Sequence, residues 1–240
     1  MIRFVGVSKA FGAKQVLKDF NLEIRDGETM VLLGYSGTGK SVALKHIVGL
    51  LEPDEGYVEV DGRNVSELSR DDLTALRASI GYVFQFAALF DSMTVADNLA
   101  LALRQQKVAE DEIDERVREA LGRIGLPDAG PRYPAELSGG MRKRVGIARA
   151  IVMRPRYILY DEPTTGLDPV TSAVIDQLMV ATKQDLGVTG VVVTHDMRSA
   201  FAVADRIAML YEGGVRAVGP AAEIRETDDP VVRQFIEGRP

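Results

Sequence analysis

The chain has 240 residues, of which 46% are hydrophobic and 27% are charged. This composition is ordinary for a globular protein and excludes a disordered, collagen-like or coiled-coil chain. The absence of cysteine excludes disulfides, thiolate nucleophiles and thiolate zinc sites. The 29 Lys and Arg residues against 35 Asp and Glu give a net charge of −6, which disfavours a surface that binds nucleic acid throughout. Any phosphate site therefore has to be built locally.

Neither a membrane span nor a signal peptide is visible in the sequence. No apolar run reaches the roughly 18 residues that a membrane-spanning helix needs. The first residues, Met1 to Val5, lack the charged, apolar and small-residue succession of a signal peptide. We therefore expect a chain that does not cross a membrane by itself and that resides in the cytosol.

The first part of the chain is dominated by predicted strands. Residues Ile2 to Ile24 are expected to form an antiparallel ribbon that turns at Phe11 to Lys14. The apolar run Met30 to Leu33 is typical of a strand buried on both faces. A glycine-rich loop over Gly34 to Gly39 and an amphipathic helix over Ser41 to Leu51 follow it. The next predicted elements are a hairpin over Gly56 to Val65, a helix that begins near Ser69 and a strand over Ile80 to Phe84.

The second part of the chain becomes helical and then returns to an α/β pattern. From about Thr94 to Val152 the spacing is helical, and Glu110 to Ile124 has one apolar face. This stretch is typical of a helical subdomain inserted into a sheet protein. The elements expected after it are a strand at Tyr157 to Asp161, a helix at Val170 to Leu186, a strand at Gly190 to Thr194, a helix at Met197 to Ala204 and a hairpin at Ile207 to Val218.

One segment matches the phosphate-binding pattern G-x-x-x-x-G-K-[ST], between the buried strand and the amphipathic helix that this motif requires. Its residues are Gly34, Tyr35, Ser36, Gly37, Thr38, Gly39, Lys40 and Ser41. Glycines let backbone N–H groups face phosphate oxygens, and the helix N-terminus adds positive potential. We expect Lys40 to neutralise the β- and γ-phosphates of a nucleotide and the Ser41 hydroxyl to bind Mg²⁺.

Two later strands end in residues suited to phosphoryl chemistry. Asp161 and Glu162 end the strand that begins at Tyr157, and His195 follows the next one. Asp161 can hold Mg²⁺ through water, Glu162 can orient or deprotonate an attacking water, and His195 can bond the γ-phosphate. Acids at a strand end and single histidines are often only structural, and His46 keeps that interpretation. The phosphate loop favours the catalytic interpretation for the other three.

A second anion site is predicted at Leu137 to Met141. Ser138 is a good helix N-cap, and with Gly139 and Gly140 it offers a hydroxyl, flexible backbone N–H groups and a helix dipole at one place. Two separate phosphate loops in one compact domain can be completed by a second copy across a two-fold axis.

The motifs stand in an order that resembles the nucleotide-binding domain of an ABC transporter, and the resemblance covers essentially the whole chain. The matching features are Walker A at Gly34 to Ser41, the Q-loop Gln85, the signature loop at Leu137 to Met141, Walker B at Ile158 to Glu162, the D-loop at Gly166 to Asp168 and the switch histidine His195. It implies an α/β fold: a RecA-like P-loop NTPase core with an antiparallel β subdomain at about 1–95 and 153–240. Residues 96–152 would be the inserted helical subdomain.

The resemblance also implies a head-to-tail homodimer that sandwiches two ATP molecules with Mg²⁺. Lys40, Glu162 and His195 would be the catalytic residues, and Ser41, Gln85 and Asp161 would hold the metal ion. Ser138, Gly139 and Gly140 would bind the γ-phosphate of the ATP held by the partner. The remaining nucleotide contacts implied are Phe11, stacked on adenine, with Val16, Tyr35, Val42 and Asp168. Taken alone, Phe11 is more typical of a core residue.

Within this family, several stretches are similar to the ATPases of Mla/MCE-type lipid transporters. The segments are Ser36 to Lys45, Phe84 to Phe90, Leu137 to Arg144, Asp161 to Pro169 and Val231 to Gly238. Met141, where many family members have Gln, is then a subfamily trait. This similarity implies phospholipid transport powered through separate transmembrane permease subunits and an MCE-domain substrate-binding protein. The expected location is the cytoplasmic face of a bacterial inner membrane, without a nucleic-acid partner.

Other functions remain open at this stage. The catalytic residues would be the same in an ATPase subunit of a small-solute importer. Soluble ABC ATPases of translation or DNA repair usually carry paired domains or long coiled coils, and a P-loop kinase outside the family would lack Leu137 to Gly140. The apolar segment Phe86 to Phe90 is either a turn packed on the helical subdomain or part of a cleft for a membrane partner.

Overall fold

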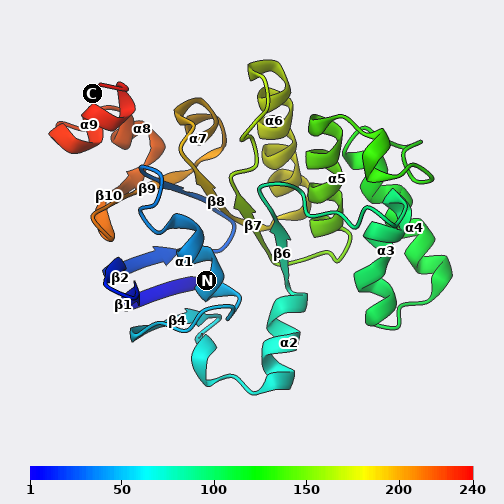
Figure 1. The fold of residues 1–240 in the computed structure, drawn as a ribbon, viewed down its shortest axis with the longest axis horizontal. Coiled ribbons are helices and arrows are strands. Elements are labelled where there is room, and N and C mark those ends of the chain that lie inside the picture. The colour runs from blue at the N-terminus through cyan, green and yellow to red at the C-terminus, as the bar shows by residue number, and fades with distance from the viewer. Residues whose placement is uncertain (240) are drawn as a thin grey trace.

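The computed structural model describes residues 1–239, which form two sheets with helices around them (Figure 1). The larger sheet has the strand order β10-β9-β3-β8-β7-β6, with β10 antiparallel to β9 and the other neighbours parallel. Its strands are β3 (Thr29–Leu33), β6 (Ile80–Val83), β7 (Tyr157–Asp161), β8 (Thr189–Thr194), β9 (Arg206–Tyr211) and β10 (Gly214–Pro220).

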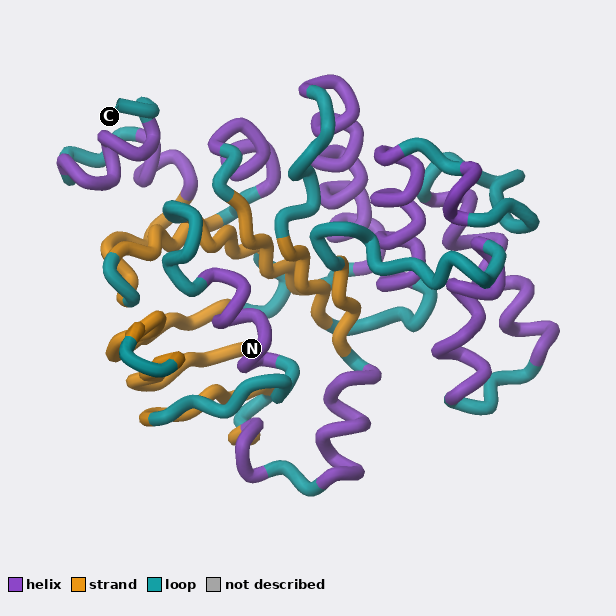
Figure 2. Tube along the Cα trace, in the orientation of Figure 1, coloured by secondary structure: helices purple, strands orange, loops and turns teal. Residues whose placement is uncertain are grey.

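The smaller sheet is antiparallel and has the order β2-β1-β4-β5. Its strands are β1 (Ile2–Phe11), β2 (Lys14–Ile24), β4 (Glu55–Val60) and β5 (Arg63–Asn64). In Figure 2 it lies below one end of the larger sheet, and α1 lies between the two. The N-terminal ribbon and the hairpin that turns at Asp61 and Gly62 are thereby confirmed.

Helices cover both faces of the larger sheet. They are α1 (Lys40–Ile47), α2 (Arg70–Ala78), α3 (Val95–Gln105), α4 (Glu110–Arg123), α5 (Gly139–Ile151), α6 (Pro169–Leu186), α7 (Met197–Val203), α8 (Ala221–Arg225) and α9 (Pro230–Ile236). Two 3₁₀ turns occur at Val65–Glu67 and Pro134–Glu136. Figure 1 shows α3, α4 and α5 gathered at the end of the molecule opposite α8 and α9.

The central strand β3 explains why its sequence is a continuous apolar run. Val31 and Leu33 belong to the hydrophobic cluster that includes residues of α3 to α7. Met30 and Leu32 belong to the cluster made with α1 and the antiparallel sheet. Because side chains alternate along a strand, a strand covered on both faces needs apolar residues at every position.

Three predicted boundaries were wrong. Helix α1 ends at Ile47 rather than Leu51, because Gly49 adopts φ +62°, and Leu50 is 57% exposed. Strand β6 ends at Val83. The stretch Thr94 to Val152 is not helical throughout, because residues 125–138 contain only the 3₁₀ turn at Pro134–Glu136. Helices α8 and α9 were not predicted.

Candidate functional site

The glycine-rich loop connects β3 to α1 and borders a cavity of about 450 Å³. The cavity is lined by Phe11, Lys14, Val16, Ser36, Gly37, Gly39, Lys40, Ser41, Val42, Gln85 and Glu162. The structure therefore brings together most of the residues that were predicted to bind nucleotide. Within the described chain no side chain caps α1, so its first N–H groups are free to meet an anion.

Glycine is required at the last turn of this loop. Gly39 has φ +98°, and a Cβ there would lie 2.8 Å from the Val16 carbonyl oxygen. The close approach of β2 to the loop is thus possible only without a side chain. It also places Val16, beside Phe11, against the phosphate loop.

The Lys40 side chain folds back onto its own loop. Its ammonium donates to the carbonyl oxygens of Gly34 (2.8 Å) and Tyr35 (2.9 Å). Burial lowers the pKa of Lys40, and the carboxylates of Glu162 and Asp161 partly oppose this shift. A cation with little solvent and acids nearby is suited to exchanging carbonyl partners for a phosphate.

A pair of hard oxygen ligands lies where α1 meets the end of β7. The Ser41 hydroxyl donates to Asp161 Oδ1 at 2.7 Å, and the Tyr82 hydroxyl of β6 donates to Asp161 Oδ2 at 3.2 Å. The Asp161 carboxylate and burial raise the pKa of Tyr82, so its phenol stays protonated. Mg²⁺ is commonly held by one or two protein oxygens together with phosphates and water, so these residues fit that ion.

Glu162 and His195 are in contact at the ends of β7 and β8. His195 Nδ1 lies 2.9 Å from Glu162 Oε2, and the Thr165 hydroxyl donates to the same oxygen at 2.9 Å. Glu162 has φ +50°, and its N–H donates to the Val193 carbonyl at 2.9 Å. A non-glycine residue held in this conformation is typical of a functional site, because the surroundings must impose it. The structure brings the predicted catalytic pair together, with Glu162 at the phosphate cavity and both residues at a second, adjoining cavity.

Lys143 links α5 to Gln85 and to Glu162. The sequence did not predict this role. Its ammonium, on α5, donates to the backbone carbonyls of Gln85 and Glu162, the latter at 3.2 Å. Burial lowers the pKa of Lys143, with Glu162 opposing. In the sequence it was one of several basic residues on a helix, and nothing in the spacing distinguished it from Arg142 or Arg144.

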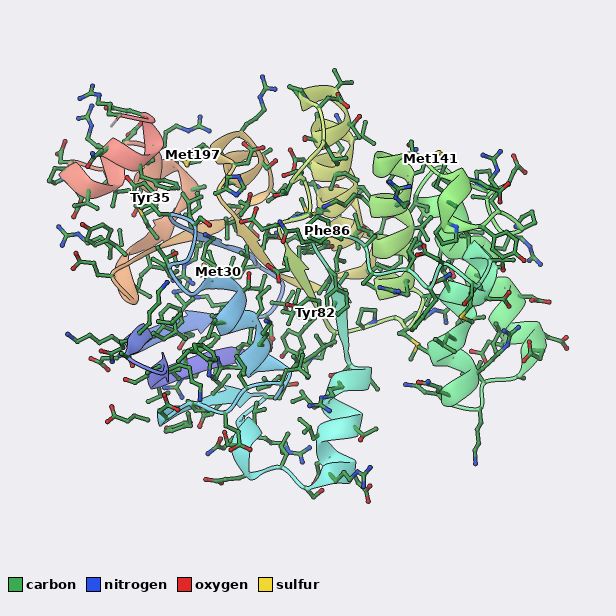
Figure 3. All side chains as sticks on the ribbon, viewed as in Figure 1. Met30, Tyr35, Tyr82, Phe86, Met141 and Met197 are labelled. Carbon is green, nitrogen blue, oxygen red and sulfur yellow. The ribbon has the colours of Figure 1, made fainter. Side chains whose placement is uncertain are left out.

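The signature residues lie elsewhere. Ser138 caps α5, and its Oγ accepts from the Met141 N–H at 3.2 Å. Within residues 1–239, neither Ser138 nor Gly139 nor Gly140 lines the phosphate cavity. Figure 3 places Met141 on α5, far across the molecule from Tyr35 of the phosphate loop. Asp168 is likewise exposed, and it caps α6 by accepting from the Val170 and Thr171 N–H groups at 3.0 Å.

A second cavity, of about 730 Å³, adjoins the catalytic pair. Tyr35, Glu162 and His195 form one wall, and residues of α9 and the segment after it form the other. The Tyr35 and Phe235 rings meet edge to face with centroids 4.7 Å apart. Tyr35 is thus placed to contact α9 as well as the phosphate loop, which the sequence did not indicate.

Comparisons with known proteins match this geometry. A family model described as "ABC transporter" matches residues 17–165, which is more than half of the chain. This chain belongs to the ABC transporter family of ATPase domains. The phosphate loop, Asp161 and Glu162 all lie within the matched range.

Relatives and solved structures agree with the assignment. This ABC ATPase domain is 44% identical to "Probable ribonucleotide transport ATP-binding protein mkl" of Mycobacterium leprae over 99% of the chain and 69% of that protein. It is 41% identical to "Protein TRIGALACTOSYLDIACYLGLYCEROL 3, chloroplastic" of Arabidopsis thaliana, over 97% and 72%. The ATP-binding cassette MJ0796, solved as a dimer with ADP and phosphate, superposes with a TM-score of 0.83 at 36% identity over 92% and 99%. The expected ABC ATPase fold is confirmed.

Proposed function

We propose that this ATP-binding domain hydrolyses ATP at the edge of the sheet where Glu162 and His195 meet. The observation that carries the proposal is the 2.9 Å contact between His195 Nδ1 and Glu162 Oε2 beside the phosphate cavity. In this arrangement Glu162 accepts a proton from the attacking water, and His195 holds that water and the γ-phosphate in place. Lys40 exchanges its two carbonyl partners for phosphate oxygens.

The same proposal assigns the metal ligands and the nucleotide contacts. Ser41, Asp161 and Gln85 would hold Mg²⁺, which neutralises charge on the β- and γ-phosphates when bound. Phe11 has an exposed ring at the mouth of the cavity, where it would stack on adenine beside Val16. The loop residues from Gly34 to Gly39, with Val42, would surround the phosphates. Lys143 and Thr165 would keep Gln85 and Glu162 in position.

A complete site would need a second copy of the chain. Ser138, Gly139 and Gly140 are too far from the cavity to serve it in the same chain, yet they present a helix N-terminus to the surface. The dimer with ADP and phosphate found for MJ0796 supports a head-to-tail pair here, in which each signature loop covers the partner's nucleotide. Asp168 would then lie at the contact between the copies. We infer that α3, α4 and α5 act as the helical subdomain that carries this loop.

The proposed cellular role is to power transport through separate membrane subunits. No helix within residues 1–239 is long and apolar enough to cross a bilayer. The turn at residues 85–88 packs on α5, because Ala87 is buried and the Arg149 side chain donates to the Ala87 and Ala88 carbonyls. Phe86 is nevertheless 82% exposed, with Phe84 and Phe90 also exposed beside it in the sequence. An apolar patch next to Gln85 suits a helix from a permease subunit. We place this contact at the cytoplasmic face of a bacterial inner membrane.

For the transported substance we propose a phospholipid, in an assembly with an MCE-domain protein. The stretches similar to Mla/MCE-type ATPases support this, as does the relative whose name is that of a glycolipid. Transport of a small solute is the second candidate, because the Mycobacterium relative is named for ribonucleotides. The two candidates share every catalytic residue.

Purification of the native complex tests these assignments. Under the lipid proposal, the chain copurifies with a permease, an MCE-domain protein and phospholipid detected by mass spectrometry. A permease with a periplasmic solute-binding protein and no lipid would favour the second candidate. Ribosomes or DNA in place of membrane subunits would contradict the transporter role altogether.

A further inference from the structure

A buried polar cluster connects α6, α7 and the segment that follows Glu162. At its centre, Ser199 Oγ lies 3.0 Å from Asp176 Oδ2, 3.2 Å from Asp196 Oδ2 and 3.4 Å from Thr164 Oγ1. Asp176 is 4% exposed and Ser199 is 1% exposed. Asp176, Ser199 and Thr164 are thus buried while Asp196 is partly exposed, and none of the four lines the phosphate cavity.

Two members of the cluster belong to the segments that carry the catalytic pair. Thr164 follows Glu162 by two residues, and Asp196 follows His195 directly. Asp196 also caps α7, because its Oδ1 accepts from the Arg198 and Ser199 N–H groups at 2.9 and 3.4 Å. A shift of Asp176 or Ser199 would therefore be passed to both sides of the Glu162–His195 contact.

The number of protons available for hydrogen bonds in the cluster indicates the protonation state of Asp176. Ser199 has one hydroxyl proton, which two ionised carboxylates cannot both receive. Within residues 1–239, Asp176 Oδ1 has no hydrogen-bond partner. Below about pH 6 a protonated Asp176 resolves the conflict, because it donates to Ser199 Oγ while Ser199 donates to Asp196. Burial raises the pKa of Asp176 to about 6, with Asp196 acting in the same direction and Ser199 and Arg198 opposing.

We propose that Asp176 is a positioning residue for ATP hydrolysis, acting through Ser199 to hold Glu162 and His195 together. This inference rests on the proposed function, because the spacing of Glu162 and His195 matters only if both act on the γ-phosphate. A buried acid with an unpaired oxygen is unfavourable for folding, so packing alone does not account for it.

The test compares Asp176→Asn, Asp176→Ala and a packing control, Met179→Ala, which lies on the same helix and is equally buried. The amide of Asn can donate to Ser199 as the protonated acid does, so at about pH 5.5, where the acid is mostly protonated, kcat should stay within about twofold of the parent. Asp176→Ala should lower kcat about tenfold or more, because small displacements of catalytic groups have large effects on rate. The KM for ATP and nucleotide affinity should change by less than about twofold. Met179→Ala should lower the melting temperature but not kcat.

An unchanged kcat in Asp176→Ala, or an equal loss in Met179→Ala, would overturn the positioning role. Hydrogen exchange keeps this test separate from the proposed function. Asp176→Ala should speed amide hydrogen exchange at residues 162–168 and 194–199. This effect does not depend on whether the chain hydrolyses ATP. Failure of the parent chain to hydrolyse Mg-ATP would contradict the proposed function, whereas unchanged exchange would contradict the positioning role.

Discussion

The two loops that we propose to bind phosphate are built in opposite ways. The loop over Gly34 to Ser41 is lined by β2, by the ends of β3 and β7 and by Gln85, and its Lys40 and Ser41 side chains are paired inside the chain. The loop at Ser138 to Gly140 is held by its cap on α5 and by the close approach of Gly140 to Thr171, and Ser138 and Gly139 are exposed. The first region is organised before any ligand arrives, whereas the second requires a surface to bind against. Under the proposed function, each chain would supply half of a site, with the phosphate loop on one face and the signature loop on another.

Among the substitutions that test this comparison, Glu162→Gln should have the largest effect. Removing the general base should reduce kcat by about 10²–10⁴-fold, because the amide cannot accept the water's proton. The phosphate contacts of Lys40 and Ser41 remain, so ATP binding persists and a dimer should accumulate. ATPase assays and light scattering with ATP measure both effects. A strictly monomeric variant in the presence of ATP would contradict the shared site.

A smaller effect is expected from Ser138→Arg, which alters the exposed region only. The long cation should obstruct the approach of a partner's nucleotide and reduce ATPase activity by about 10²–10³-fold, the range for losing one donor to a developing negative charge. Binding of ATP to the isolated chain, measured by fluorescence titration, should stay nearly unchanged. An equal loss of affinity would mean that the two loops serve one nucleotide within one chain. Ser66→Arg, at an exposed position far from both loops, is the control.

The buried carboxyl of Asp176 should make the free energy of unfolding depend on pH. Asp176 has a folded-state pKa of about 6 against 3.8 when unfolded, so the folded chain binds the proton more tightly. Its contribution to the free energy of unfolding is fully present below about pH 4 and is lost as pH rises through 6, a decrease of about 3 kcal/mol. Urea titrations at pH 4.5 and 7.5 should show about 2 kcal/mol of this decrease relative to Asp176→Asn, because part of the contribution is already lost at pH 4.5. Parallel pH dependences in the two proteins would contradict a buried titrating Asp176.

The smallest effect on the isolated chain is expected from Phe86→Ser. The ring is mostly exposed, so stability should change by less than about 0.5 kcal/mol and ATPase activity should be preserved. Copurification of membrane subunits should be reduced, because the apolar patch beside Gln85 is lost. Retention of the full complex would show that this surface does not contact the permease.

The sequence allowed prediction of what depends on local spacing. The pattern from Gly34 to Ser41 requires no tertiary contact to be recognised, and the strand ends at Asp161 and His195 follow from apolar runs that stop. The end of α1 could also have been predicted, because Gly49 interrupts the helical pattern.

What could not be predicted depends on contacts between distant segments. Lys143 was indistinguishable from its basic neighbours until α5 was seen to bring its ammonium to the Gln85 and Glu162 carbonyls. Asp176 lies on an amphipathic helix whose sequence gives no reason to bury an acid. Its role depends on Ser199, 23 residues away, and on the packing of α6 against α7.

The contact between Tyr35 and Phe235 gives the phosphate loop a connection to the C-terminal helix α9. The chain contains no tryptophan, so an indole introduced by Phe235→Trp would be the single fluorophore of its kind. It would lie against Tyr35, whose backbone carbonyl accepts from the Lys40 ammonium. Under the proposed function, Lys40 exchanges this carbonyl for a phosphate oxygen when nucleotide binds. The occupancy of the phosphate loop can thus be read optically at the far end of the chain, without labelling the nucleotide.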